Sequence, residues 1–166
     1  TNIKLADTRK TTPGLRIFEK YAFKCGGGVN HRMGLYDAAM IKENHIAWTD
    51  NLNNAVKKIR LNSPFTTHII IEAENIEQAK EAVLAGADSV LLDELSPEII
   101  KKNVQELRYL SMNSLKKEVN KNLIIEVSGI NPQEISKYLI KGIDLISTSS
   151  SITKSNWIDL SMRYIN

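Results

Sequence analysis

"THIIIEAENIEQAKEAVLAGADSVLLDEL", residues 67–95, contains a complete strand, helix and strand in succession. The three isoleucines 69–71 are β-branched and predict a strand. Asn75, with Gln78 three residues later, predicts the start of a helix, and Gly86 predicts its end. The apolar segment "DSVLLDEL" then predicts a second buried strand. Two such strands joined by a helix are typical of parallel neighbours in an α/β protein.

The same unit recurs along the rest of the chain. Two segments also form a weak internal repeat, "LAGADSVLLD" and "LIKGIDLIST". In each, a helix ends on glycine and an aspartate precedes a buried strand. Further strands are predicted in "IKLAD" (3–7), "AAMIKEN" (38–44), "LIIEVSG" (123–129) and "IDLISTSSS" (143–151). Helices are predicted in "LRIFEKYAFKC" (15–25), "NLNNAVKKIRLN" (51–62), from Ser96-Pro97 through about Leu110, in "QEISKYLIKG" (133–142) and in "WIDLSMRY" (157–164).

Two architectures could accommodate six strand and helix units, an open doubly wound sheet and a barrel. No G-x-G-x-x-G or G-x-x-x-x-G-K-[ST] motif follows any predicted strand, which removes the main support for a dinucleotide or P-loop fold. We therefore predict an α/β fold, a parallel (β/α) barrel-like domain of about six βα units that forms an incomplete TIM-like barrel. Residues 1–166 would form this one domain.

Composition narrows the functional classes. The chain has 166 residues, of which 42% are hydrophobic and 25% charged, as in a soluble globular domain. Its formal net charge of +3 is too small to indicate nucleic-acid binding, and its lysines are scattered over helical segments. Cys25 is the only cysteine, which excludes an intramolecular disulfide and favours a reducing cytoplasm. No apolar run approaches the roughly 20 residues of a membrane helix.

Polar residues occur where the predicted strands end. In parallel α/β folds the carboxyl ends of the strands carry the active site, so these side chains are expected to meet at one edge. They are Asp7, Thr8, Arg9 and Lys10 after the first strand, Lys42 after the second, Glu72 after the third, Asp93 after the fourth, Ser128 and Gly129 after the fifth, and Thr148 to Ser151 after the sixth.

The residue types at this edge suggest what it binds. Arg9, Lys10, His31, Arg32 and Lys42 form a cationic set suited to carboxylates or phosphates. Two acids ending apolar strands suit sugar hydroxyls, Mg²⁺ or a developing positive charge. Small-residue loops before helix amino termini suit a terminal phosphate. Together these features indicate a phosphoribosyl substrate with an anionic acceptor.

Five segments carry a resemblance to a known family. "DTRKTTPGLR", "GGGVNHRMGLYDAAMIKENH", "IIIEAENIEQA", "VLLDEL" and "EVSG" resemble the successive signature segments of quinolinate phosphoribosyltransferase, across nearly the whole chain. The resemblance implies an enzyme of NAD biosynthesis. It would convert quinolinate and phosphoribosyl pyrophosphate to nicotinate mononucleotide, pyrophosphate and CO₂, with Mg²⁺ as cofactor.

The resemblance also implies roles for individual residues. Arg9, His31 and Arg32 would bind the two quinolinate carboxylates, with Thr8 beside them, and Lys10 and Lys42 would face the phosphates and the reacting ring. Glu72 and Asp93 would hold the ribose hydroxyls directly or through Mg²⁺, and with Lys42 they form the expected catalytic set. The 5′-phosphate would lie against Ser128, Gly129 and Ile130 and the loop of Thr148, Ser149 and Ser150. Glu126, two residues before Ser128, is a reserve candidate.

The chain departs from the family pattern at three places. Family members begin with an amino-terminal sandwich domain, which contributes an arginine to the neighbouring subunit's site; we therefore expect a fragment of a longer two-domain protein that forms a homodimer or higher oligomer. The fifth strand ends in "SGI" where Ser-Gly-Gly is usual, and the last loop reads "STSSSITKS" where a glycine and Thr-His-Ser are common.

Two alternatives remain open at this point. One is a related phosphoribosyltransferase with a different carboxylate acceptor. The other is a non-catalytic barrel remnant that binds phosphate or carboxylate.

Overall fold

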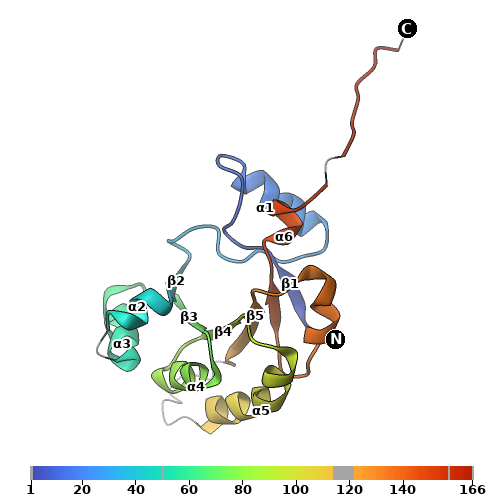
Figure 1. Cartoon of the computed structure of the whole chain (residues 1–166). Coiled ribbons are helices and arrows are strands. Elements are labelled where there is room, and N and C mark those ends of the chain that lie inside the picture. Colours follow the sequence, from blue (N-terminus) through green and yellow to red (C-terminus); the bar gives the residue numbers. More distant parts are fainter. Residues whose placement is uncertain (1, 50, 114–121, 157, 166) are drawn as a thin grey trace.

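A single six-stranded parallel sheet organises the chain, with strand order β1-β6-β5-β4-β3-β2 (Figure 1). The computed structural model describes residues 2–49, 51–113, 122–156 and 158–165. The strands are β1 (Lys4–Ala6), β2 (Ala38–Ile41), β3 (His68–Ala73), β4 (Ser89–Asp93), β5 (Ile124–Ser128) and β6 (Leu145–Ser147). The helices are α1 (Arg16–Cys25), α2 (Glu43–Ala47), α3 (Leu52–Asn62), α4 (Ile76–Ala85), α5 (Pro97–Asn113), the 3₁₀ helix η1 (Pro132–Tyr138) and α6 (Ser150–Thr153).

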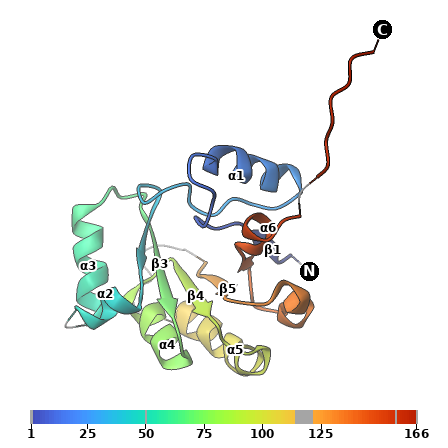
Figure 2. The ribbon, with the colours of Figure 1, turned by 45° about the horizontal axis from the view of Figure 1, so that its top comes forward.

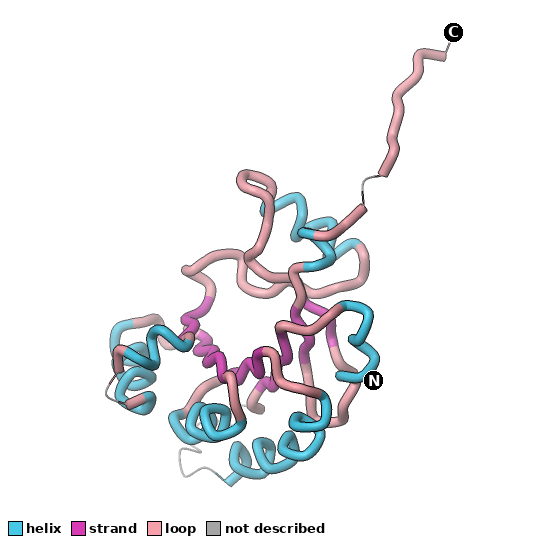
Figure 3. Tube along the Cα trace, viewed as in Figure 1, coloured by secondary structure: helices cyan, strands magenta, loops and turns pink. Residues whose placement is uncertain are grey.

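The sheet curves into an arc whose two edge strands, β1 and β2, face an opening (Figure 3). Helices α3, α4 and α5 cover the outside of the arc, whereas α1 and α6 lie together over the open side (Figures 1 and 2). The loop between α1 and β2 crosses this opening, and its Val29 adds one parallel bridge to Ala6 of β1. The predicted incomplete barrel is therefore confirmed.

Strand alternation divides the side chains between two environments. Ile69, Ile71, Val90, Leu92 and Ile125 belong to the main core, which includes buried residues of the outer helices. The intervening residues face the inside of the arc, where Ala38, Ile70 and Leu91 form a small separate cluster. On β3, β4 and β5 the same alternation places Glu72, Asp93 and Ser128 on the inward side near the carboxyl end of the strand.

Most of the predicted helix boundaries are confirmed. The Asn75 side chain accepts from the Gln78 N–H at 2.9 Å, and Gly86 ends α4 in the left-handed conformation with φ of 91°. The Gln78 side chain also reaches back, but it accepts from the Glu74 N–H at 2.8 Å instead of from Asn75. Helix α5 continues three residues past the predicted end at Leu110, to Asn113.

Four predictions for other segments need correction. The predicted strand 143–151 is shorter, Leu145–Ser147, because Ser150 begins the helix α6. The predicted strand 38–44 ends at Ile41, because Glu43 begins the short helix α2. The helix predicted over 133–142 is instead the 3₁₀ helix η1, in which Ile135 and Tyr138, three residues apart, both contact the core. The helix predicted over 157–164 is wrong for 158–164, which contain no helix; Trp157 lies outside the described residues.

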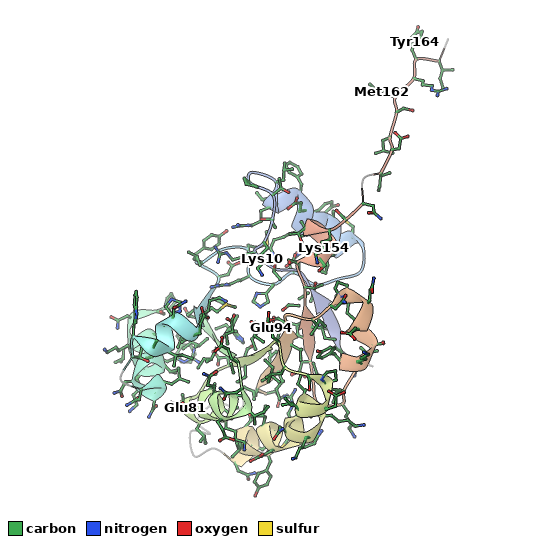
Figure 4. The ribbon with its side chains drawn as sticks, in the orientation of Figure 1. Lys10, Glu81, Glu94, Lys154, Met162 and Tyr164 are labelled. Atoms are coloured by element: carbon green, nitrogen blue, oxygen red, sulfur yellow. The ribbon has the colours of Figure 1, made fainter. Side chains whose placement is uncertain are left out.

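The tail conformation has a simple physical explanation. Residues 158–165 extend away from the body, with Met162 and Tyr164 at its far end (Figure 4). The apolar side chains of Ile158, Leu160 and Met162 are at least 79% exposed, so no packing surface supports a helix. An isolated segment of this length does not form a stable helix in water.

The weak internal repeat in the sequence corresponds to a repeated hydrogen-bond arrangement. Asp88 accepts from the Ile69 N–H at 2.8 Å and pairs with Arg60 at 2.6 Å. Fifty-six residues later, Asp144 accepts from the Ile125 N–H at 2.8 Å and pairs with Arg108. Each arginine also donates to backbone carbonyls, Arg60 to Thr67 and Arg108 to Gly142.

Both of these Asp–Arg pairs lie at the amino-terminal ends of the strands. Each joins a helix to the start of two strands by satisfying backbone groups that would otherwise have no partner. They stabilise the end of the sheet opposite to the carboxyl ends of the strands.

Within the described residues, no helix is both long and apolar enough to cross a membrane.

Candidate functional site

The register of the sheet brings the predicted site residues together at the carboxyl ends of the strands. Glu72 is level with Leu91 on β4, which is level with Glu126 on β5. Asp93 is level with Ser128 one layer higher. Lys42 directly follows β2, whose last residue Ile41 pairs with Ile71. These polar residues therefore line the inward side of one end of the arc.

A buried ion pair ties the first two loops to this end of the barrel. The Lys20 ammonium donates to the Asp7 carboxylate, and both side chains are fully buried. Lys20 also donates to the His31 carbonyl at 3.1 Å. Asp7 accepts from the Asn30 side chain at 2.6 Å and from the His31 N–H at 2.8 Å. This network fixes the loop after β1 against the loop that carries His31.

Both ring nitrogens of His31 are occupied within the protein. Nδ1 accepts from the Arg32 backbone N–H at 2.8 Å. Because Nδ1 is an acceptor, a neutral ring carries its proton on Nε2, which lies 3.1 Å from Oε2 of Glu126. The second oxygen of Glu126, Oε1, is buried and has no hydrogen-bond partner among the described residues. His31 thus links the loop to β5.

Arg32 joins the end of this loop to β2. Its Nη1 donates to the Ala38 carbonyl at 2.8 Å and its Nη2 contacts Met40 Sδ at 3.4 Å, so the loop is joined to the free edge of β2. Burial and the nearby positive charge of Arg9 lower the pKa of Arg32, while Asp37 raises it. The buried Nε of Arg9 has no partner in the described part of the chain. Two neighbouring guanidinium groups of this kind favour an anion between them.

A second part of the site, on β3 and β4, is acidic. Lys42 Nζ lies 2.5 Å from Oε2 of Glu72, whose side chain is 10% exposed. Burial raises the pKa of Glu72, and the Lys42 partner offsets part of this effect. The charge of Asp93 raises the pKa of Glu72 further, so the two predicted acids are electrostatically coupled.

Asp93 is held by the carboxyl end of β5. The Ser128 hydroxyl donates to Oδ1 of Asp93. Gly129 has a φ of 70°, and a Cβ at this position would lie 2.5 Å from Glu94 Cγ and 3.1 Å from the same Asp93 oxygen. Glycine is therefore required here by both backbone conformation and space.

The remaining predicted residues occupy different environments. The Thr148 hydroxyl accepts from the Ser150 N–H at 3.1 Å, while Ser149 precedes α6. The Ile130 side chain is in the hydrophobic core, which leaves only its backbone available to a ligand. Lys10 is exposed, and its N–H donates to the Thr8 hydroxyl at 3.0 Å.

Sequence reasoning did not identify two members of the site and ranked a third too low. Lys20 and Asn30 were not predicted, because a lysine within an amphipathic helix and an asparagine in a loop resemble ordinary surface residues. Glu126 was only a reserve candidate, although its position two residues before Ser128 on a strand already indicated an inward side chain.

The described residues contain no cluster of three or more His, Cys, Asp or Glu side chains that could hold a metal ion alone. Glu72 and Asp93 supply carboxylate oxygens at neighbouring strand ends, which is compatible with a hard cation that takes its other ligands from a bound phosphate compound.

Comparisons with known proteins identify relatives of this chain. The sequence profile of the family described as "Quinolinate phosphoribosyl transferase, C-terminal domain" matches residues 1–163. The chain is 42% identical over 161 residues to the probable nicotinate-nucleotide pyrophosphorylase (carboxylating) of Methanothermobacter thermautotrophicus, covering 96% of this chain and 55% of that protein. The human nicotinate-nucleotide pyrophosphorylase (carboxylating) is 32% identical over 159 residues, covering 96% of this chain and 51% of the human protein.

A solved structure is also similar. The crystal structure of NadC from Streptococcus pyogenes superposes with a TM-score of 0.84 at 38% identity, covering 98% of this chain and 53% of that one. The chain thus spans about half the length of the relatives it matches.

Proposed function

The chain belongs to the quinolinate phosphoribosyltransferase C-terminal domain family, and from this premise we propose that it transfers phosphoribosyl from phosphoribosyl pyrophosphate to quinolinate. The products would be nicotinate mononucleotide, pyrophosphate and CO₂, a step of NAD biosynthesis. The observation that carries this proposal is the division of charge at the strand ends. Two neighbouring arginines face one part of the site, and two coupled acids with a lysine occupy another.

The cationic part suits a dianionic acceptor. Arg9 has a buried Nε without a partner among the described residues, and Arg32 lies close enough for its pKa to respond to Arg9. A ring with two adjacent carboxylates would offset both positive charges. A monocarboxylate would offset only one, which favours quinolinate over such an acceptor.

The acidic part suits the sugar. Glu72 and Asp93 can accept hydrogen bonds from ribose hydroxyls, and their negative charge favours an anomeric carbon that becomes positive as pyrophosphate leaves. The Ser128 hydroxyl donates to Asp93, so the 5′-phosphate would bind the backbone at Ser128 and Gly129 and the hydroxyl groups of the Thr148 to Ser150 loop. Lys42, already paired with Glu72, is 43% exposed and can turn toward the phosphates or the ring.

The proposed chemistry requires orientation more than covalent catalysis. The pyridine nitrogen of quinolinate attacks the anomeric carbon, and pyrophosphate leaves with the electrons of the broken C–O bond. The ring nitrogen then carries a positive charge, so the adjacent carboxylate can leave as CO₂ while its electrons remain on the ring carbon, which takes up a proton. The protein positions two anionic substrates and offsets their charge, and no nucleophilic side chain is needed.

Magnesium fits this assignment as part of the phosphoribosyl substrate. Glu72 and Asp93 would hold it, and when bound it would neutralise charge on the departing pyrophosphate.

Because the chain spans only about half of its relatives, we propose that the complete enzyme includes an amino-terminal domain and that a neighbouring subunit completes the acceptor site. A homodimer or higher oligomer follows from that proposal.

A product assay tests the function directly. Chain 1–166 and the longest natural form of the protein are each incubated with quinolinate, phosphoribosyl pyrophosphate and Mg²⁺, and nicotinate mononucleotide is measured by chromatography. Parallel reactions contain nicotinate in place of quinolinate. We expect product from quinolinate in the longer form at least. Product from nicotinate alone would favour another acceptor, and the absence of turnover in both forms would contradict the proposal.

A further inference from the structure

Glu126 is the buried acid of the site to which the proposed chemistry assigns no task. Its side chain is 2% exposed and lies on the inward side of β5, level with Leu91, which separates it from Glu72 along the same layer of the sheet. Its Oε2 contacts His31 at 3.1 Å, whereas Oε1 has no hydrogen-bond partner among the described residues. Burying a carboxylate is costly unless its hydrogen bonds serve a purpose.

The contact continues from Glu126 to a substrate-binding candidate. Oε2 of Glu126 accepts the proton on His31 Nε2, which leaves Nδ1 as an acceptor for the Arg32 N–H at 2.8 Å. The Arg32 side chain in turn donates to the Ala38 carbonyl of β2 at 2.8 Å. The tautomer and position of the His31 ring therefore act on the Arg32 backbone, from which the guanidinium extends to Ala38.

The other contacts of His31 support this reading. Its backbone is fixed independently, since its N–H donates to Asp7 and its carbonyl accepts from Lys20. The ring is thus the only part of His31 that Glu126 needs to orient. Because both ring nitrogens are engaged, the ring has no N–H left to offer a substrate carboxylate in this arrangement.

We propose that Glu126 is a positioning residue of the acceptor site: it holds His31 in the Nε2–H tautomer, and His31 then fixes the Arg32 segment that binds the acceptor carboxylate. His31 accordingly acts on the acceptor site through the Arg32 backbone. The inference about acceptor binding rests on the proposed function, whereas the tautomer follows from the geometry of this chain alone.

The conservative variant Glu126→Gln separates this task from a general requirement for charge. A glutamine can present its side-chain oxygen to His31 Nε2–H, and because Oε1 has no partner in the described residues, its replacement by an amide breaks no described hydrogen bond. Glu126→Ala removes the acceptor altogether. Glu81→Ala is the matched control, since Glu81 is exposed on α4 on the outer layer (Figure 4).

The first measurement is the tautomer of His31 in the wild-type chain. Long-range ¹⁵N NMR of the histidine rings, with His31→Ala used for assignment, is expected to show a protonated Nε2 and an unprotonated Nδ1. A proton on Nδ1, or a ring without a preferred tautomer, would overturn the proposal even if quinolinate is not the substrate. Because it uses the wild-type chain, this measurement tests the proposal even if Glu126→Ala does not fold.

The second measurement is quinolinate affinity by calorimetry. We expect Glu126→Ala to weaken binding roughly tenfold, the lower end of the scale found for partners that orient metal-binding histidines. Glu126→Gln and Glu81→Ala should remain within about threefold of wild type. Equal affinity in Glu126→Ala, or equal losses in the Ala and Gln variants with both folded, would refute the positioning role. No quinolinate binding by wild type would instead refute the proposed function and leave the tautomer result to decide the role of Glu126.

Discussion

Replacing Lys20 by methionine should destabilise the chain more than any change on the exposed face of the same helix. Methionine keeps most of the unbranched stem but removes the ammonium group. That group donates to Asp7 and to the His31 carbonyl, and the Lys20 and Asp7 side chains are both fully buried. The variant would leave Asp7 as a buried carboxylate without its cation.

The expected magnitude follows from what Asp7 retains. Removing one partner of a buried ion pair costs about 3–5 kcal/mol. Asp7 still accepts from the Asn30 side chain and the His31 N–H at 2.6 and 2.8 Å, so we expect the lower end of that range. A loss of about 3 kcal/mol in the free energy of unfolding corresponds to a fall of about 6–12 °C in the melting temperature of a domain of this size.

Urea denaturation followed by circular dichroism measures the effect. Lys24→Met, on the exposed surface one turn further along α1, is the control and should change stability by less than about 0.5 kcal/mol. The double variant Asp7→Asn, Lys20→Met tests the mechanism, because neutralising both partners removes the uncompensated charge. It should be more stable than Lys20→Met alone.

Two results would refute this reasoning. One is a loss below about 1 kcal/mol in Lys20→Met, since a buried pair cannot be broken at so small a cost. The other is a double variant as unstable as the single variant, which would mean that the Lys20 stem packing, and not the charge on Asp7, dominates.

Three further predictions concern ligand binding and pH. Arg32→Ala should weaken quinolinate binding by at least about tenfold, or 1.4 kcal/mol, while circular dichroism shows an intact fold; unchanged affinity by calorimetry would contradict the carboxylate assignment. Asp93→Ala should lower kcat far more than it changes quinolinate affinity, and a normal steady-state rate would count against its role near the sugar. Burial raises the pKa of Glu72 above its usual 4.5, so the folded state binds this proton more tightly than the unfolded state, and the stability that depends on it is lost as pH rises through the folded value. Glu72→Gln, which resembles the protonated form, should therefore be more stable than wild type at about pH 7 and equal to it below the unfolded pKa, and urea midpoints across this range measure the difference.

Local signals predicted most of the fold because they act over a few residues. Gly86 adopts the left-handed conformation required after α4, and Asn75 caps its start, as their spacing indicated. The predicted 157–164 helix failed for 158–164 for the opposite reason. Its apolar periodicity is real, but a helix of that length depends on a packing surface, and the sequence pattern does not specify where such a surface lies.

The site was predictable where it follows strand ends and less so where the chain folds back. Glu72, Asp93 and Ser128 end strands, so the parallel topology alone brings them together. Lys20 is different, because it lies within a helix and contacts Asp7 thirteen residues earlier. Only the path of the loop over the open side of the barrel buries it, and no periodicity records that path.

Two loops beside the opening between β1 and β2 shape the cationic part of the site. The loop after β1 carries Arg9 and the loop before β2 carries Arg32, while β3, β4 and β5 carry the acids Glu72, Asp93 and Glu126. The cationic and acidic parts meet where Lys42 pairs with Glu72 and where His31 contacts Glu126. An anionic ring held by the arginines and a sugar held by the acids would therefore meet at this boundary, with the ring nitrogen directed toward the carbon that becomes positive. The same loop contacts that close the barrel would thus determine the angle of attack, so a change that loosens either loop should reduce turnover even when both substrates still bind.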